Sequence, residues 1–424
     1  EIYTLSLHDA LPIFGASFLI VIFVTVLWVE QSFAGNAPDF VLDSKSAILI
    51  EGKTGRVIYQ KGADVQRTPA SLTKMMTCIL TLENLDLEEK ITIPKEAAGI
   101  QGNNIGLKPG EVLTVRELVN AMMIYSANDT AVALAIRISG SVDNFCRLMN
   151  KKARSLGCTR TNYINPNGLT DSQSHITTAR DQSIIARYLM KKSEAAKIVR
   201  KSKYTVPQTN KSGPRKLKST NEMLSGRKHE YKGIVGVKTG FMLSSGYCFA
   251  GKAQKNNEEF IAVVLNAGDE DKRFVDCGKL LDYGFNNYET VEFLKKGGSA
   301  GKVKVRYGSK TRVDTVVPDG SYLPVAKRET GYEKNIDVKM YDDVKAPIKK
   351  GTKVGEIVVY KDGRKISSSD IQIAETVKSG GPWSKYYISN RMFFIFVVGT
   401  VIITFMIIRM KRRRKNRFSG GGRR

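Results

Sequence analysis

A serine and a lysine stand three positions apart in the segment PASLTKMM, where Ser71 and Lys74 follow Pro69. Residues three apart on a helix share one face, so the hydroxyl and the amine are expected to meet. A lysine in water has a pKa of about 10.4, but burial and a second nearby cation both lower it. Such a lysine can take the proton of a serine hydroxyl without help from a histidine. Thr68 is expected to cap the helix, which leaves its free N–H groups near Ser71.

The S-x-x-K pair alone is weak evidence, because a solvated helix face accounts for most such pairs. Two later motifs make it specific. Ser126–Asn128 (Ser-Ala-Asn) separates two stretches of helical spacing, and Lys238–Gly240 (Lys-Thr-Gly) lies in a strand-like run. The order S-x-x-K, S-x-N, K-T-G is a known set for serine acyl transfer. An earlier Lys-Thr-Gly at 53–55 precedes the serine at a predicted hairpin turn, so we assign it no role.

Composition excludes several classes of protein. The chain has only three histidines, and its five cysteines form no C-x-x-C pair, which disfavours a zinc ribbon. The net charge is +26, with nine lysines or arginines and no acid from Arg409 to the end. The remaining positive charge carries no nucleic-acid-binding motif, so nucleic acid is not an expected partner. No metal or organic cofactor is implied.

Two apolar segments divide the chain. We interpret residues 14–34, with the apolar run Phe14–Val29, as a signal peptide; a retained anchor is the alternative. Residues 1–13 resemble a translated sequencing adaptor, which we interpret as an assembly artefact. Residues 392–408 are predicted to cross a membrane, between aromatic residues and the basic tail at 409–424. The positive-inside rule then places the tail in the cytoplasm and the rest of the chain outside.

The region between the apolar segments changes character near Tyr288. Residues 38–288 mix helical and strand-like patterns, including a predicted hairpin at 46–60, and are interpreted as an α/β (α+β) domain. Residues 289–380 consist of short stretches in which apolar and polar residues alternate. An Asp-Gly hairpin turn is predicted at 362–363, and we interpret the region as a β-sandwich. Residues 381–391 are then a linker to the membrane segment.

Residues 38–380 resemble the low-molecular-mass penicillin-binding proteins, serine D-alanyl-D-alanine carboxypeptidases that trim peptidoglycan stem peptides. The segments that carry the resemblance are PASLTKMMT, NNIGLKPGE, YSANDTAVALA, NPNGLTDSQSHITTARD, GVKTGF and APIKKGTKVGEIVVY. The resemblance implies a penicillin-binding/β-lactamase-like transpeptidase fold, followed by a β-sandwich and a membrane helix. It also implies removal of the terminal D-alanine through an acyl-enzyme, acylation by β-lactam antibiotics, and a catalytic domain outside the cell membrane.

The resemblance also implies roles for individual residues. Ser71 is expected to be the acylated nucleophile and Lys74 its general base, and Ser126 is expected to pass a proton to the leaving D-alanine. The substrate-binding residues implied are Asn128, Lys238, Thr239, Gly240 and Arg273, the last by a looser match. The oxyanion hole is expected to consist of the backbone N–H groups of Ser71 and Phe241. Structural roles are expected for His175, Cys78 and Asp181.

Three alternatives stay open at this point. A β-lactamase shares the three motifs, although no convincing E-x-x-L-N loop is found between the second and the third. A DD-endopeptidase uses the same catalytic set. A non-catalytic wall-binding protein keeps the fold without turnover. One departure from the family bears on this choice, because Met242 follows KTGF where the family often has threonine, and Ser244–Gly246 replaces a more usual alanine-containing triplet.

Overall fold

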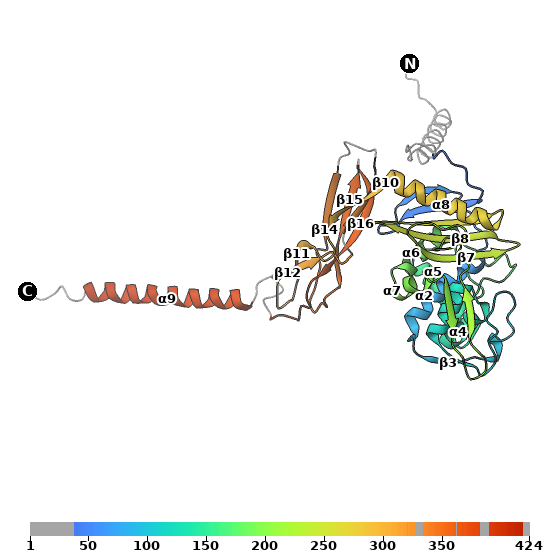
Figure 1. Ribbon diagram of the computed structural model, residues 1–424. Coiled ribbons are helices and arrows are strands. Elements are labelled where there is room, and N and C mark those ends of the chain that lie inside the picture. The colour runs from blue at the N-terminus through green and yellow to red at the C-terminus, as the bar shows by residue number, and fades with distance from the viewer. Residues whose placement is uncertain (1–37, 320, 328–333, 362, 382–389, 419–424) are drawn as a thin grey trace, which may run out of the picture. The chain divides into compact units, whose positions relative to one another are not determined.

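The computed structural model describes residues 38–319, 321–327, 334–361, 363–381 and 390–418. The predicted artefact at 1–13 and the predicted signal peptide at 14–34 lie outside these residues, as does most of the predicted linker. The described residues comprise a mixed helical and stranded region, a purely stranded region and one long C-terminal helix (Figure 1).

A five-stranded antiparallel sheet supports the first region, in the order β2-β1-β9-β8-β7. Its strands are β1 (Ser46–Glu51), β2 (Val57–Lys61), β7 (Ile234–Met242), β8 (Gly246–Lys255) and β9 (Glu258–Ala267). Both β8 and β9 are buried on successive residues, as expected for strands covered on both faces. Figure 1 shows α8 (Glu270–Asn287) on one face and the other helices of this region on the opposite face. The predicted hairpin is confirmed as β1 and β2.

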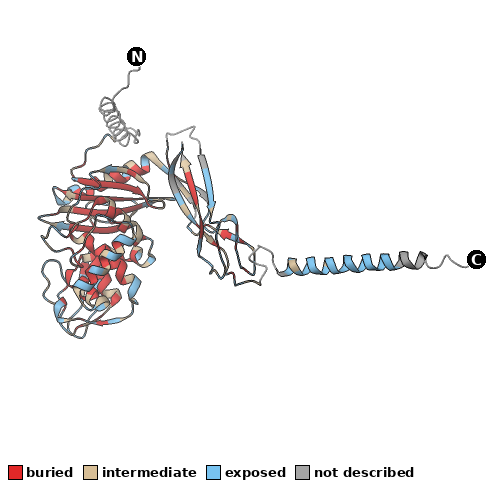
Figure 2. Cartoon of the chain, turned by 180° about the vertical axis from the view of Figure 1, so that it is seen from behind, coloured by how far each residue is buried: buried red, intermediate tan, exposed pale blue. Residues whose placement is uncertain are grey.

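The helical part of this region carries the first two motifs. Its helices are α2 (Lys74–Asn84), α3 (Val115–Asn120), α4 (Asn128–Ser139), α5 (Val142–Ser155), α6 (Ala179–Met190) and α7 (Ser193–Val199). Short strands pair as β3 (Lys90–Thr92) with β4 (Val112–Thr114), and as β5 (Lys203–Val206) with β6 (Arg215–Lys218). Helices α2 and α4 are buried over most of their length, which is typical of helices inside a core. Figure 2 shows this core in red.

The start of the serine-bearing helix differs from the prediction. Ser71 lies in a short 3-10 turn, η1 (Ala70–Thr73), and the α-helix begins only at Lys74. The predicted cap by Thr68 is wrong: no side chain caps this turn, and the Thr68 hydroxyl instead bonds to the Ser245 hydroxyl at 2.6 Å. The tighter turn still places Ser71 and Lys74 on one face, because side chains three apart eclipse in a 3-10 turn.

The stranded region consists of two sheets that share one core. Strands β10 (Tyr288–Leu294) and β13 (Ser321–Ala326) form the smaller sheet. The larger has the order β11-β12-β16-β15-β14, with β11 (Ser299–Lys304), β12 (Arg312–Val316), β14 (Lys334–Met340), β15 (Lys353–Lys361) and β16 (Arg364–Ile373). Val325 of the smaller sheet belongs to the same buried cluster as Ile357 and Ile371 of the larger. The predicted fold class, an α+β domain followed by a β domain, is therefore confirmed.

The C-terminal helix α9 runs from Asn390 to Phe418. Its stretch Arg391–Arg412 contains an 18-residue window with a mean hydropathy of 2.4 and no buried residue, and the stretch is long enough to cross a bilayer. The predicted membrane segment at 392–408 lies inside this stretch. The helix continues without a break into the first part of the predicted basic tail.

Candidate active site

Lys74 is fully buried, and its side-chain nitrogen has three polar neighbours. Nζ lies 2.8 Å from Ser71 Oγ, 2.7 Å from Asn128 Oδ1 and 2.7 Å from the Asn167 carbonyl oxygen. Amide and carbonyl oxygens only accept hydrogen bonds, whereas a hydroxyl can also donate. A neutral amine donates two hydrogens and accepts one through its lone pair. An ammonium would donate to all three oxygens, and a neutral Lys74 satisfies them equally when the Ser71 hydroxyl donates to it; this second arrangement is the geometry of a general base.

The surroundings of Lys74 favour this neutral form. Burial holds the pKa of Lys74 well below its usual value, and the positive charge of Lys238 lowers it further. Asp129 opposes this effect, but its carboxylate is occupied by the backbone N–H groups of Ile105 and Leu107. The balance lowers the pKa of Lys74 and so favours an amine that can accept a proton.

Ser126 and Lys238 form a second buried pair. A π-helical turn (Ala121–Tyr125) ends at Ser126, whose φ of 69° lies in the left-handed region. Lys238 Nζ donates to Ser126 Oγ at 2.9 Å and to the Thr239 carbonyl at 2.9 Å. Burial, with a smaller contribution from Arg273, lowers the pKa of Lys238 to about 7. Because Ser126 Oγ accepts from Lys238, the Ser126 hydroxyl proton is available to another acceptor.

Strand β7 approaches the nucleophile turn at Gly240. A Cβ atom at this position would lie 3.1 Å from the Pro69 carbonyl oxygen and 3.3 Å from Ser71 N. A larger residue would push the strand away from Ser71, so glycine allows the close approach. The next residue, Phe241, is 45% exposed and stacks on Tyr247 with ring centroids 4.2 Å apart.

Arg273 on α8 reaches the same strand. Its Nη1 donates to the Gly240 carbonyl at 3.3 Å, and its Nη2 lies 2.7 Å from a carboxylate oxygen of Glu270. The guanidinium also faces the ring of Tyr247 at 5.3 Å. The structure therefore brings Arg273 to the site that the looser sequence match suggested.

A loop to which the sequence analysis gave no role in the site holds Lys74 from the opposite side. The Asn167 carbonyl accepts from Lys74, and the next residue, Gly168, has a φ of 82°. A Cβ atom on Gly168 would lie 1.9 Å from the Ala70 carbonyl oxygen, so only glycine fits. Asn165 Oδ1 accepts from the N–H of Gly168 at 2.7 Å and closes the turn. The sequence Asn-Pro-Asn-Gly at 165–168 indicates a tight turn, but it does not indicate that this turn contacts Lys74.

A buried hydrogen-bond chain supports the residue before the nucleophile. His175 Nδ1 accepts from the Ile164 N–H at 3.1 Å, so Nε2 carries the proton and donates to Thr73 Oγ1 at 2.9 Å. Thr73 in turn donates to the Ala70 carbonyl at 2.8 Å. Burial lowers the pKa of His175 to about 4, which keeps the ring neutral. Ala70 has a φ of 46°, so this chain helps to hold a strained residue next to Ser71.

Replacing Thr73 with valine tests this support. The change removes the hydroxyl at nearly constant volume and leaves the Ala70 carbonyl without its partner, which costs about 1–3 kcal/mol. We expect the rate constant for acylation of Ser71 to fall about tenfold, while reversible binding of the acylating compound stays unchanged. Stopped-flow acylation kinetics separate the two quantities. Thr73→Ser keeps the hydroxyl and should retain the parent rate. Equal losses in both variants would contradict the role of the hydrogen bonds from His175 through Thr73 to Ala70.

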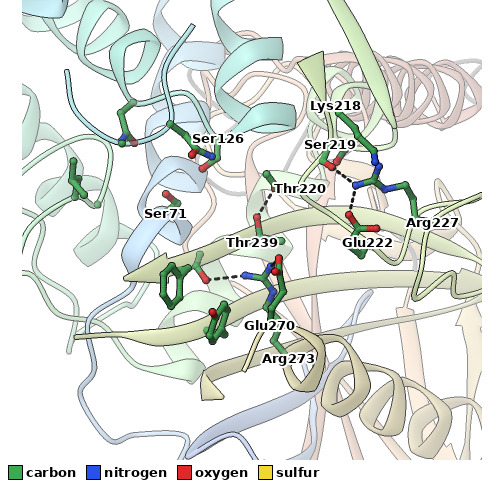
Figure 3. A pocket seen from close by; sticks show the side chains of 18 residues that line it. Ser71, Ser126, Lys218, Ser219, Thr220, Glu222, Arg227, Thr239, Glu270 and Arg273 are labelled. Carbon is green, nitrogen blue, oxygen red and sulfur yellow. Dashed lines mark hydrogen bonds and ion pairs between the residues drawn. The ribbon is translucent and has the colours of Figure 1, made fainter. Parts of the chain in front are cut away.

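The predicted residues meet at one cavity of about 670 Å³. Lining it are the predicted residues Ser71, Ser126, Asn128, Thr239, Gly240, Phe241 and Arg273, with Lys74 and Lys238 buried behind them. Figure 3 shows Ser71 and Ser126 on one side, and Lys218, Glu222 and Arg227 on the other, with Thr220 and Thr239 between. Thr220 Oγ1 lies 2.5 Å from Thr239 Oγ1. The sequence analysis missed this second group, because its contacts depend on the folded chain.

Comparison with known proteins identifies the chain. Residues 32–269 match the D-alanyl-D-alanine carboxypeptidase family, peptidase S11, and residues 288–379 match the C-terminal domain of penicillin-binding protein 5. The chain belongs to this carboxypeptidase family. D-alanyl-D-alanine carboxypeptidase DacF of Bacillus subtilis is 36% identical over 345 residues, which cover 80% of this chain and 87% of that protein.

Solved structures agree with this assignment. Penicillin-binding protein 5 from Haemophilus influenzae has a TM-score of 0.64 and 27% identity, and the match covers 81% of this chain and all of that one. Penicillin-binding protein D2 from Listeria monocytogenes, solved in an ampicillin-bound form, has a TM-score of 0.52 and 32% identity over 58% of this chain and all of that one. The chain is thus a serine-type D-alanyl-D-alanine carboxypeptidase with a low-molecular-mass penicillin-binding protein fold.

The departure after KTGF has a structural counterpart in this carboxypeptidase. Met242 ends β7 and is not among the residues that line the cavity within the described chain. Ser244 and Ser245, in the turn after β7, form hydrogen bonds to other segments. The Ser244 hydroxyl donates to Asp171 at 2.8 Å, and the Ser245 hydroxyl bonds to the Thr68 hydroxyl at 2.6 Å. The unusual triplet therefore connects β7 to the loop that follows Gly168 and to the segment that leads into Ser71.

The remaining notable side chains have structural positions. All five cysteines are free and buried, and burial raises the pKa of the Cys78 thiol to about 12. Asp181 accepts from the Arg160 N–H and the Thr161 hydroxyl and so braces the start of α6. Among the residues that the structure describes, no group of three or more histidine, cysteine or acidic side chains is placed to hold a metal.

Proposed function

We propose that Ser71 is the nucleophile and Lys74 the general base of this carboxypeptidase. The observation that carries the assignment is the contact of 2.8 Å between Ser71 Oγ and the Nζ of Lys74, a lysine whose burial lowers its pKa. Ser71 Oγ bonds to the carbonyl carbon of the penultimate D-alanine while its proton passes to Lys74 Nζ. The N–H groups of Ser71 and Phe241 stabilise the negative oxygen that develops.

Collapse of this intermediate releases the terminal residue. The C–N bond breaks, and the proton held by Lys74 reaches the departing amine through the Ser126 hydroxyl. The acyl group stays on Ser71 until water, deprotonated by Lys74, attacks it and restores the enzyme. Asn128 is proposed to hold the substrate amide, although its Oδ1 accepts from Lys74 and its Nδ2 donates to the Gln101 carbonyl in the unliganded site.

The terminal carboxylate of the substrate is proposed to bind at Thr239, Lys238 and Arg273. Thr239 and Arg273 line the cavity with a hydroxyl and a guanidinium, and the Lys238 amine lies buried behind them. A β-lactam carries a carboxylate next to its reactive amide, so the same residues are proposed to bind it before Ser71 is acylated. The ampicillin-bound relative from Listeria monocytogenes supports this part of the proposal.

Release of D-alanine tests the assignment. The full chain in detergent would be incubated with an acylated peptide ending in D-Ala-D-Ala, beside Ser71→Ala and the exposed control Ser155→Ala. We expect the parent and the control to release D-alanine, and Ser71→Ala to lose at least about 10⁴-fold. Equal release by Ser71→Ala would contradict the assignment. Cleavage of a cross-linked peptide dimer alone would instead support an endopeptidase, and no cleavage by the folded parent would support a wall-binding protein.

We also propose that α9 anchors the carboxypeptidase in the cell membrane, with its catalytic domain outside. The apolar stretch Arg391–Arg412 and the basic residues after it support this orientation. Trypsin added to intact protoplasts should digest the catalytic domain and spare an epitope placed after Phe418. Protection of the catalytic domain would contradict the orientation.

A further inference from the structure

The cavity continues beyond the residues proposed to bind the terminal carboxylate. Its lining includes Lys218 at the end of β6 and, from the segment that follows, Ser219, Thr220, Glu222 and Arg227. Thr239 lies between Ser71 and this group in Figure 3, so a leaving residue that binds at Thr239, as proposed above, would extend toward this group. Nothing in the proposed mechanism uses this part of the cavity.

The charges in this part of the cavity are not balanced. Glu222 and Arg227 form an ion pair, and Arg227 also donates to the Ser219 carbonyl at 2.7 Å. The other lining carboxylate, Glu270, pairs with Arg273 at 2.7 Å. Both acids are therefore neutralised within the cavity wall.

Lys218 is the cation that remains. It is exposed, and within the described part of the chain its amine has no hydrogen-bond acceptor and no carboxylate partner. Lys203 stands directly opposite it in the β5–β6 pair, and both side chains are exposed. Like charges in such a cross-strand position repel one another and strengthen the local positive potential. An anion bound here would relieve that repulsion.

We propose that Lys218 forms an outer anion-binding position for a second carboxylate, carried by the side chain of the leaving residue. The proposal rests on the proposed function, because it requires the leaving residue to point past Thr239. The ligand class is a peptide whose C-terminal D-residue has an acidic side chain. The Lys238, Thr239 and Arg273 group binds the main-chain carboxylate of that residue, and Lys218 binds the side-chain carboxylate.

Two peptides that differ in one group test this position. They share the acylated D-alanine and end in D-Glu or in D-Gln, and a third peptide ends in D-Ala. Release of the terminal residue would be measured for the full-length parent, for Lys218→Met and for Lys95→Met, an exposed lysine on the short turn η2 (Lys95–Ala97). We expect the parent to prefer D-Glu over D-Gln by about three- to fivefold in kcat/KM, as for a partly exposed ion pair. Lys218→Met should lower that ratio to about one, and Lys95→Met should keep it.

A second measurement makes the result independent of turnover. Binding of the D-Glu and D-Gln peptides to Ser71→Ala, with and without Lys218→Met, gives the same comparison in an enzyme that cannot be acylated. The preference should also shrink at high salt. An unchanged ratio in Lys218→Met, or a preference for D-Gln in the parent, would overturn the proposal. Failure of the proposed function appears separately, as no release of D-alanine from the third peptide by the parent.

Discussion

Replacing Lys74 with methionine is expected to lower the rate of Ser71 acylation by about 10³-fold, the usual range for loss of a general base. The methionine keeps an unbranched side chain, one atom shorter than lysine, but cannot take the proton of Ser71. Acylation by a fluorescent penicillin, followed in real time, gives the rate, and circular dichroism establishes that the variant is folded.

Lys74→Arg separates the base from the charge. Arginine keeps a cation next to Ser71 but does not lose its proton under any condition of assay. If Lys74 acts as a base, this variant should be as slow as Lys74→Met. Substantial activity in Lys74→Arg would show that only a positive charge is needed, and the neutral-amine mechanism would be wrong.

Replacing Gly168 with alanine is the second large effect that we expect, although this residue takes no part in the chemistry. The added Cβ would lie 1.9 Å from the Ala70 carbonyl oxygen, so the nucleophile turn or the Asn167 carbonyl must move. Displacement of a catalytic group by about 1 Å can cost about 10²-fold in rate. Both acylation by penicillin and release of D-alanine should fall by about that factor, and the melting temperature should fall as well.

Gly157→Ala is the matched control for Gly168→Ala. Gly157 has a φ of 86°, close to the 82° of Gly168, but no atom lies within 4 Å of its added Cβ. This control carries the same backbone strain without the clash, so its acylation rate should equal that of the parent. Similar losses in both variants would show that backbone strain, and not contact with Ala70, causes the effect.

The structural setting of each motif could be predicted because each motif has its own local structure. The S-x-x-K pair shares one face as expected, although Ser71 lies in a 3-10 turn and not in the α-helix, and the S-x-N motif after a helical turn and Lys238–Gly240 in a strand lie as expected. Helical spacing, strand alternation and the Asp-Gly hairpin signal are local properties, so the fold class could also be predicted. The roles of Ser71 as nucleophile and Lys74 as general base are predictions, which the variants of these two residues test.

The features that sequence reasoning missed depend on contacts between distant parts of the chain. The Thr68 hydroxyl bonds to Ser245 rather than to the turn beside it, because β7 and β8 bring Ser245 close. The Asn167 carbonyl holds Lys74 across 93 positions of sequence. Every residue has a backbone carbonyl, so the sequence does not indicate which carbonyl will contact Lys74. The outer position of Lys218 is likewise visible only once the cavity is formed.

The pH dependence of Ser71 acylation tests the central claim, the neutrality of Lys74, most directly. The second-order rate of acylation by penicillin would be measured on the full chain from pH 5 to about 10.5, the ordinary lysine range. Burial and the charge of Lys238 hold the pKa of Lys74 well below that range, so the rate should stop rising before the pH at which an ordinary lysine loses its proton. Loss of the proton from Lys238, whose pKa is lowered to about 7, should then reduce the rate at alkaline pH. A rate that instead keeps rising to about pH 10.5 would show that Lys74 is an ordinary charged lysine, and would contradict the mechanism.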